Sequence, residues 1–112
     1  MPMYLARFTY TPETWAKLLA SPEDRFAALA PAYEAAGGKL HGAWYAFGDA
    51  DGYVLAELPD AIMAAGAMTK AAASGAFTSI STTPLLTVEQ MLDALRYGAG
   101  VAYRAPGAAA AG

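Results

Sequence analysis

His41 is the side chain of this 112-residue chain best suited to acid–base chemistry, and it is the only histidine. An imidazole changes charge near neutral pH, so it could serve as a general base or as a ligand to haem iron. No partner motif accompanies it, and the chain has no cysteine. A hydrogen-bonded structural role is therefore the more economical interpretation, and His41 alone indicates no particular reaction.

Arg7 and Glu57 are charged residues inside otherwise apolar runs. Both fall on the same face of strands that we expect to be neighbours. Because a buried charge is costly without a partner, an ion pair between them is the first expectation. The alternative is a polar clamp that orients a ligand within a mostly apolar cavity.

Aromatic side chains gather close to His41, with Trp44 and Tyr45 directly downstream. Such residues more often fill a core or a subunit interface than form a ligand cage. If a ligand does bind, these rings and the charged groups are the side chains that would hold it. The candidate ligand-binding residues are Arg7, His41, Trp44, Tyr45 and Glu57, and no catalytic residue is assigned.

Two aspartates, Asp49 and Asp51, have the spacing that begins some calcium loops. The bidentate glutamate that such a loop needs at its twelfth position is missing, because Asp60 stands there. Aspartate is also common in tight turns, where it bonds its own backbone. We therefore interpret the pair as turn residues and expect neither a metal site nor a bound cofactor.

The candidate residues are organised around a predicted β-hairpin over residues 40–60. Aromatic and branched residues in 40–47 and 52–58 suit a pleated surface. The intervening GDADG segment has the composition of a turn, and Pro59 ends the second strand because proline cannot donate to a sheet.

Strict alternation along the hairpin defines its two faces. It places His41 and Tyr45 on one face, and Leu40, Trp44 and Glu57 on the other. Both faces carry apolar residues, whereas a sheet with one solvated face alternates cleanly between apolar and polar. We therefore expect both faces of the hairpin to be covered.

The rest of the chain supplies two more strands and several helices. Polar caps mark helix starts near residues 11, 21, 60 and 87. The expected elements are strands over 3–10 and 77–86 and helices over 12–20, 22–36, 61–74 and from 88 onward. This β-α-β-β-α-β order with an added C-terminal helix predicts an α+β, ferredoxin-like fold. Its four-stranded antiparallel sheet has the spatial order fourth, first, third and second strand.

Such a fold places its main helices on one face of the sheet and leaves the other bare. Because that second face is apolar here, burial against another copy by two-fold symmetry is the economical solution. We therefore expect a homodimer or a higher homo-oligomer. Residues 1–104 would form its single domain, and residues 105–112 a flexible tail.

Composition narrows the class of protein. Hydrophobic residues make up 56% of the chain and charged residues 15%, which excludes intrinsic disorder. The net charge of −3 and the lack of a basic stripe argue against nucleic acid and anionic membranes as partners. No apolar run is long enough to span a bilayer, and the first residues lack the layout of a signal peptide. We expect a soluble cytoplasmic protein.

Six short motifs are spread along the chain: YTPE at 10–13, SPEDR at 21–25, GGKL at 37–40, FGDADG at 47–52, ELPD at 57–60 and TTPLLT at 82–87. Together they resemble the GYD domain family, over nearly the whole chain apart from the tail. That family is named for a Gly-x-Tyr-Asp turn, and here Ala50 stands at the tyrosine position. The resemblance implies a dimeric α/β-barrel topology but no settled activity.

The leading hypothesis is a homodimeric domain that binds a small organic molecule in a mostly apolar pocket next to the sheet. One alternative is a cofactor-independent enzyme, similar to the monooxygenases or isomerases of dimeric α/β-barrel proteins. The chain has no asparagine, which several of those oxygenases use, and its histidine is on a predicted strand rather than a helix. The other alternative is a ligand-free oligomerisation or regulatory module.

Overall fold

The structure is a computed structural model that describes residues 1–107. Its elements are β1 (Met3–Tyr10), α1 (Pro12–Ala20), α2 (Arg25–Ala35), β2 (Lys39–Tyr45), β3 (Gly52–Glu57), α3 (Ala61–Ala73), β4 (Phe77–Leu85) and α4 (Val88–Ala99). The predicted element order is confirmed. Of the predicted tail, residues 108–112 lie outside the described residues, and the single-domain boundary at 104 stays a prediction.

All four strands join one antiparallel sheet with the order β2-β3-β1-β4. This is the predicted order, and it makes the protein an α+β domain of the ferredoxin-like kind. β1 and β3 form the centre of the sheet, and β2 and β4 are its edges.

Polar caps start the helices. Thr11, Asp60 and Thr87 each accept a hydrogen bond from the backbone N–H three residues later, as predicted. The predicted start of the second helix near residue 21 is wrong. Asp24 is the N-cap of α2, and Ser21 instead ends α1, because its backbone N–H bonds back into that helix.

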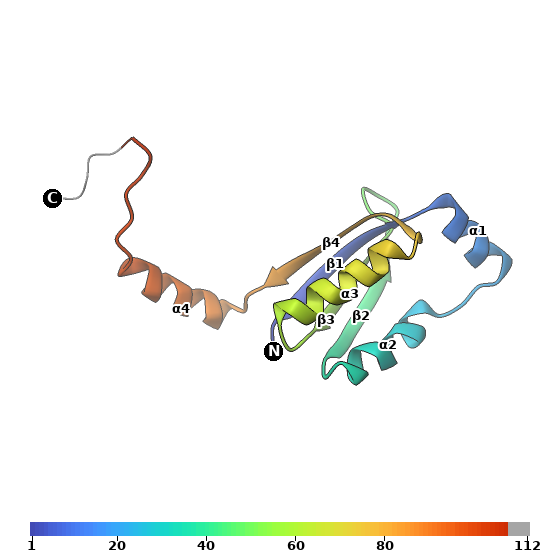
Figure 1. The fold of residues 1–112 in the computed structure, drawn as a ribbon, viewed down its shortest axis with the longest axis horizontal. Helices are drawn as coiled ribbons and strands as arrows, with labels where there is room; N and C mark the ends of the chain where they lie inside the picture. Colours follow the sequence, from blue (N-terminus) through green and yellow to red (C-terminus); the bar gives the residue numbers. More distant parts are fainter. Residues whose placement is uncertain (108–112) are drawn as a thin grey trace.

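The helices of the main body lie on one side of the sheet (Figure 1). α2 packs mainly on β2 and α3 mainly on β4, so the two helices cover opposite edges. α1 makes a smaller contact with β1. The central strands are therefore only partly covered on the helix side.

The core is correspondingly thin. Its first cluster of buried side chains consists of Phe8, Tyr10, Leu40, Val54 and Ala56. The second consists of Tyr4, Leu58 and Ala64. Neither α1, α2 nor α4 contributes a fully buried residue. The sheet thus supplies most of the core, and the alanine-rich helices cover it incompletely.

A β-bulge at His41 interrupts the pairing of β2 with β3. Leu40 lies opposite Ala56 and Gly42 lies opposite Leu55, so His41 is the extra residue. The bulge shifts the alternation by one position at this point. Leu40 is buried on the helix side, and the predicted assignment of Leu40 to the other face is wrong.

The side of the sheet away from the helices has no cover within residues 1–107, and we call it the open face. Tyr4 and Phe8 are buried on the helix side, so alternation along β1 places Met3, Leu5 and Arg7 on the open face. The register with β3 and β2 adds their facing residues. The open face carries Met3, Leu5, Arg7, Gly42, Trp44, Tyr53, Leu55 and Glu57. As predicted, apolar residues predominate where β1, β2 and β3 form this face, whereas β4 contributes the polar Thr83 and Ser81 opposite Leu5 and Arg7.

Candidate functional site

A groove of about 1000 Å³ lies on the helix side of the sheet, bordered by α1, α2 and α3. Phe8, Val54 and Ile80 from the sheet are among the residues that form its floor. Tyr33 of α2 and Ala67 of α3 are among those on its walls. The groove occupies the space that the separated helices leave over the central strands.

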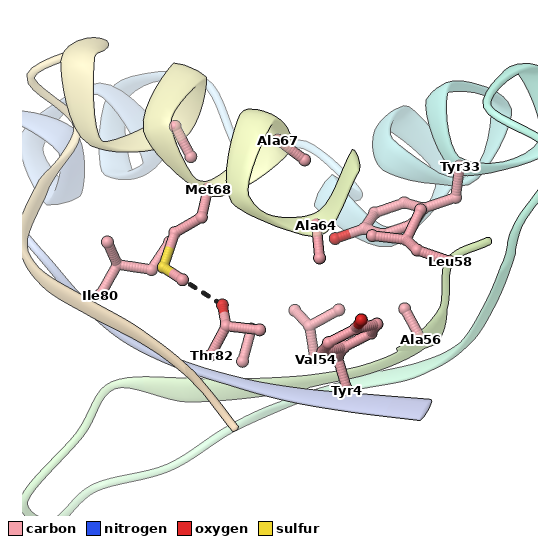
Figure 2. A pocket seen from close by; sticks show the side chains of 12 residues that line it. Tyr4, Tyr33, Val54, Ala56, Leu58, Ala64, Ala67, Met68, Ile80 and Thr82 are labelled. Carbon is pink, nitrogen blue, oxygen red and sulfur yellow. Dashed lines mark hydrogen bonds between the residues drawn. The ribbon is translucent and has the colours of Figure 1, made fainter. Parts of the chain in front are cut away.

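A smaller cavity of about 70 Å³ continues under α3 (Figure 2). It shares Val54, Ala67 and Ile80 with the groove, so the two spaces adjoin. The Thr82 hydroxyl donates a 3.3 Å hydrogen bond to the Met68 sulfur at one side of this cavity. The remaining lining is almost entirely apolar, so the cavity suits a hydrocarbon or aromatic group better than water.

One end of the groove is built from aromatic rings. The ring of Tyr10 stacks on Phe77 with centroids 5.3 Å apart, and it meets the edge of Trp15 at 5.1 Å. Phe8 lies 4.9 Å from Tyr10, and Tyr45 lies 6.4 Å from it. These offset and edge-to-face contacts hold the rings in fixed orientations.

The same end carries polar groups. Burial raises the pKa of Tyr10 well above its ordinary value, the neighbouring Tyr45 raises that pKa further, and the Arg25 guanidinium opposes the shift. Arg25 also contacts Glu23, with its Nη1 3.3 Å from the carboxylate Oε1. Burial raises the pKa of Tyr33 as well. The groove therefore has the neutral hydroxyls of Tyr10 and Tyr33 and the Arg25 guanidinium beside its aromatic rings, and its lining also includes the charged residues Glu13, Lys17, Glu23, Asp24 and Lys70.

Asp51 secures the loop that closes this end. One carboxylate oxygen accepts the backbone N–H of Tyr10 at 2.9 Å and the indole N–H of Trp15 at 3.0 Å. The backbone N–H of Asp51 donates to the carbonyl of Phe8, and its carbonyl accepts from the N–H of Ala46. The hairpin loop is thus joined to β1, to α1 and to Ala46, the residue after β2, through Asp51.

The predicted ligand-binding residues divide between the two sides of the sheet. Tyr45 lines the groove and contacts its aromatic end. Trp44 is among the residues that border the groove, but its ring lies over Gly42 on the open face and the residue is 55% exposed. Only Tyr45 therefore presents its side chain to the groove in the way the sequence suggested.

The other three predicted residues lie on the open face. The Nε2 of His41 is 3.6 Å from the Oε2 of Glu57, and both side chains are half-buried. The expectation that His41 shares a face with Tyr45 is wrong, because the bulge turns His41 away from the helices. The predicted pair of Arg7 with Glu57 is also wrong. Glu57 lies opposite Met3, four residues from Arg7 along β1, a separation of about 13 Å.

Three residues of the groove's polar and aromatic end were not selected from the sequence: Tyr10, Arg25 and Phe77. Alternation along residues 3–10 placed Tyr10 on the face of Phe8, so that signal was available. Arg25 carried no comparable signal, because its position depends on the helix starting at Asp24 rather than near residue 21.

The described residues contain no cluster of three or more histidine, aspartate or glutamate side chains that could hold a metal ion. None of the helices within residues 1–107 is long and apolar enough to cross a membrane. What the groove offers chemically is apolar contact, aromatic stacking, tyrosine hydroxyls and the Arg25 guanidinium, together with the ammonium groups of Lys17 and Lys70 and the carboxylates of Glu13, Glu23 and Asp24.

The sheet order and the one-sided helices define the chain as a ferredoxin-like domain. The crystal structure of FFRP-DM1 is similar in fold, with a TM-score of 0.50 and 19% sequence identity over 77% of this chain and 100% of that one. The GYD domain model matches residues 4–95, so the chain belongs to the GYD domain family and the sequence resemblance is confirmed. No curated protein matches it.

The turn for which the family is named now has a structural explanation in this chain. Its aspartate is Asp51, which carries the hydrogen bonds to Tyr10 and Trp15. Its tyrosine position holds Ala50, which is only 2% exposed. A residue at this position packs inside the loop, and alanine leaves that site with a small side chain.

Proposed function

We propose that this protein binds a small organic molecule in the groove between α2 and α3 and that it works as a homodimer joined through the open face. The groove is the main evidence for ligand binding. Its volume of about 1000 Å³ is at the upper end of the range of small-molecule sites. Its apolar floor with a few convergent polar groups is the usual composition of such sites.

The arrangement of groups favours a ligand with an apolar body and one polar end. The apolar part would lie on Val54 and Ile80 and extend toward the cavity under α3. The polar part would lie beside Tyr10, Tyr45 and Arg25. Tyrosine hydroxyls can both donate and accept, whereas the guanidinium only donates, so an oxygen-bearing group is the best match.

Binding rather than catalysis is the function that these residues support. The only histidine, His41, lies on the opposite side of the sheet from the groove. An imidazole base therefore has no access to a ligand held there. We accordingly propose ligand binding as the function of the groove.

Self-association follows from the open face. Leu5 lies opposite Leu55 in the sheet, with Trp44 and Tyr53 paired nearby, and nothing within residues 1–107 covers them. An uncovered apolar patch of this kind is typical of an interaction surface. Two copies related by a two-fold axis would bury it reciprocally.

The ligand proposal is tested by blocking the groove. Ala67 lines it and is exposed on α3, so Ala67→Phe would fill the space above the central strands. Ala65→Phe is the matched control, because Ala65 is exposed on the same helix but does not line the groove. Native mass spectrometry of protein purified without additives is expected to show a bound small molecule in the wild type and in Ala65→Phe.

Ala67→Phe should show the unliganded mass. Titration with the dye 8-anilinonaphthalene-1-sulfonate gives a second measure, with an expected loss of affinity of at least about tenfold for Ala67→Phe alone. Unliganded wild-type protein together with equal dye binding by both variants would refute the ligand proposal.

A further inference from the structure

α4 stands apart from the rest of the fold (Figure 1). It spans Val88–Ala99, and every residue in it is exposed. Its start is well built, because Thr87 and Gln90 form a reciprocal capping box. The sequence thus specifies this helix strongly, yet nothing else within residues 1–107 covers it.

The helix has one distinct apolar stripe. Val88, Met91, Leu92 and Leu95 follow the spacing that places side chains on a single helix face. They are between 45% and 79% exposed. An isolated helix of this length is marginal in water, even when it is capped, and most helices are held by burying such a stripe. We therefore expect a surface that receives this stripe.

The quantity of exposed surface indicates another protein chain. The accessible surface is 7959 Å² for a mass of 11.6 kDa. A compact chain of this mass exposes about 5,800 Å², which leaves a surplus on the order of 2,000 Å². Doubled over two subunits, that surplus falls within the range that obligate homodimers bury, and it exceeds what a transient contact needs.

The stripe is also continuous with the open face. Leu85, the last residue of β4, lies opposite Met3 of the open face. Leu86 follows, 63% exposed, and Val88 begins the stripe two residues later. Apolar residues therefore follow one another from Leu85 and Leu86 to Val88, with only the capping Thr87 between them. A second copy seated on the open face would meet the base of the helix.

Charge is compatible with the same arrangement. The opposite side of α4 carries Glu89, Asp93 and Arg96, and Arg96 contacts Asp93 at 3.0 Å. Because these charged groups lie on the side of α4 away from the stripe, they stay in solvent when the stripe packs on a second copy.

We propose that α4 is an exchanged arm: each subunit of the homodimer packs the stripe of its α4 onto the other subunit, beside the open face. This rests on the proposed homodimer, and it adds that the C-terminal helix completes the interface. The occupant of the stripe is a second copy of this chain. By two-fold symmetry, the α4 of each subunit packs on the other subunit, so the dimer contains two equivalent arm contacts.

Leu92→Glu in the full chain tests the arm. The substitution removes a central leucine of the stripe and places a carboxylate four residues before Arg96, a spacing that supports helix formation. Tyr97→Glu is the matched control, because Tyr97 is exposed on the opposite side of α4. The dimer dissociation constant, from sedimentation equilibrium over a dilution series, should rise at least about 100-fold for Leu92→Glu, since both arms change, and less than about threefold for Tyr97→Glu.

Leu55→Glu, on the open face, separates this proposal from the dimer itself. If Leu55→Glu dissociates a dimer that Leu92→Glu leaves intact, the homodimer stands and the exchanged arm is wrong. If the wild type is a monomer at micromolar concentration, both are wrong, while ligand binding in the groove is tested independently. Hydrogen exchange gives a second readout: the amides of α4 should be protected in the dimer and lose protection when the protein is diluted to monomer.

Discussion

Removing the carboxylate of Asp51 should loosen the aromatic end of the groove and lower the stability of the whole domain. One oxygen of this residue accepts hydrogen bonds from the backbone N–H of Tyr10 and the indole N–H of Trp15. Hydrogen bonds to a charged acceptor contribute about 1.5–3 kcal/mol each, with the lower end appropriate to a half-buried site. Asp51→Ala is therefore expected to lower the free energy of unfolding by about 3 kcal/mol.

Asp51→Asn provides a graded version of the same change. Its amide oxygen can still accept one of the two hydrogen bonds, so the expected loss is about 1–1.5 kcal/mol. For a domain of this size, 1 kcal/mol corresponds to about 4 °C in Tm. Asp51→Ala should thus melt about 12 °C below the wild type and Asp51→Asn about 5 °C below it.

Asp49→Ala is the control, because Asp49 lies two residues earlier in the same loop, is exposed and makes no hydrogen bond among those of the described side chains. Thermal and urea unfolding followed by circular dichroism would give the three values. A double-mutant cycle with Trp15→Phe should return a coupling of about 1 kcal/mol between the two residues. The reasoning is refuted if Asp51→Ala and Asp49→Ala have the same stability, or if the cycle shows no coupling.

The remaining predictions concern two glycines and two tyrosines. Gly66→Ala should stabilise the protein by about 0.5–1 kcal/mol in urea unfolding, because Gly66 is exposed in the middle of α3 and an added Cβ meets nothing within 4 Å. Gly52→Ala should destabilise it by about 1–3 kcal/mol, because a Cβ there would lie 2.4 Å from the ring of Phe8, and a stability equal to wild type would contradict this. The pKa values of Tyr10 and Tyr33 are raised in the fold, so both side chains stay protonated at a pH where the tyrosines of the unfolded chain ionise. Their contribution to the free energy of unfolding should therefore be constant up to about pH 10 and fall above it. Tyr10→Phe should make that fall shallower, and an unchanged alkaline slope in urea titrations at successive pH values would count against the buried tyrosine.

The architecture could be predicted because local signals and the overall pattern agree. The caps at Thr11, Asp60 and Thr87 determine where helices begin, and the alternation in residues 3–10 determines a strand. Once the order of elements was known, the handedness of the connections left a single sheet order.

The candidate site was harder to predict because it depends on two features without a local sequence signal. The bulge at His41 reverses the face of one strand, and nothing in the composition of residues 39–45 marks it. The separation of α2 from α3 creates the groove, and it results from which strand each helix covers. Tyr45 was therefore found by its type and location, and alternation could have found Tyr10, whereas Arg25 became a candidate only in three dimensions.

Both outer strands of the sheet carry a residue that hinders the addition of a further strand. In β2 the bulge at His41 breaks the regular row of donors and acceptors, and the exposed Lys39 precedes it. In β4, Pro84 has no backbone N–H to offer a neighbour. Edge-to-edge extension into an endless ribbon is disfavoured at either border. The proposed self-association would therefore use the broad surfaces of the sheet, where two-fold contacts close after a finite number of copies.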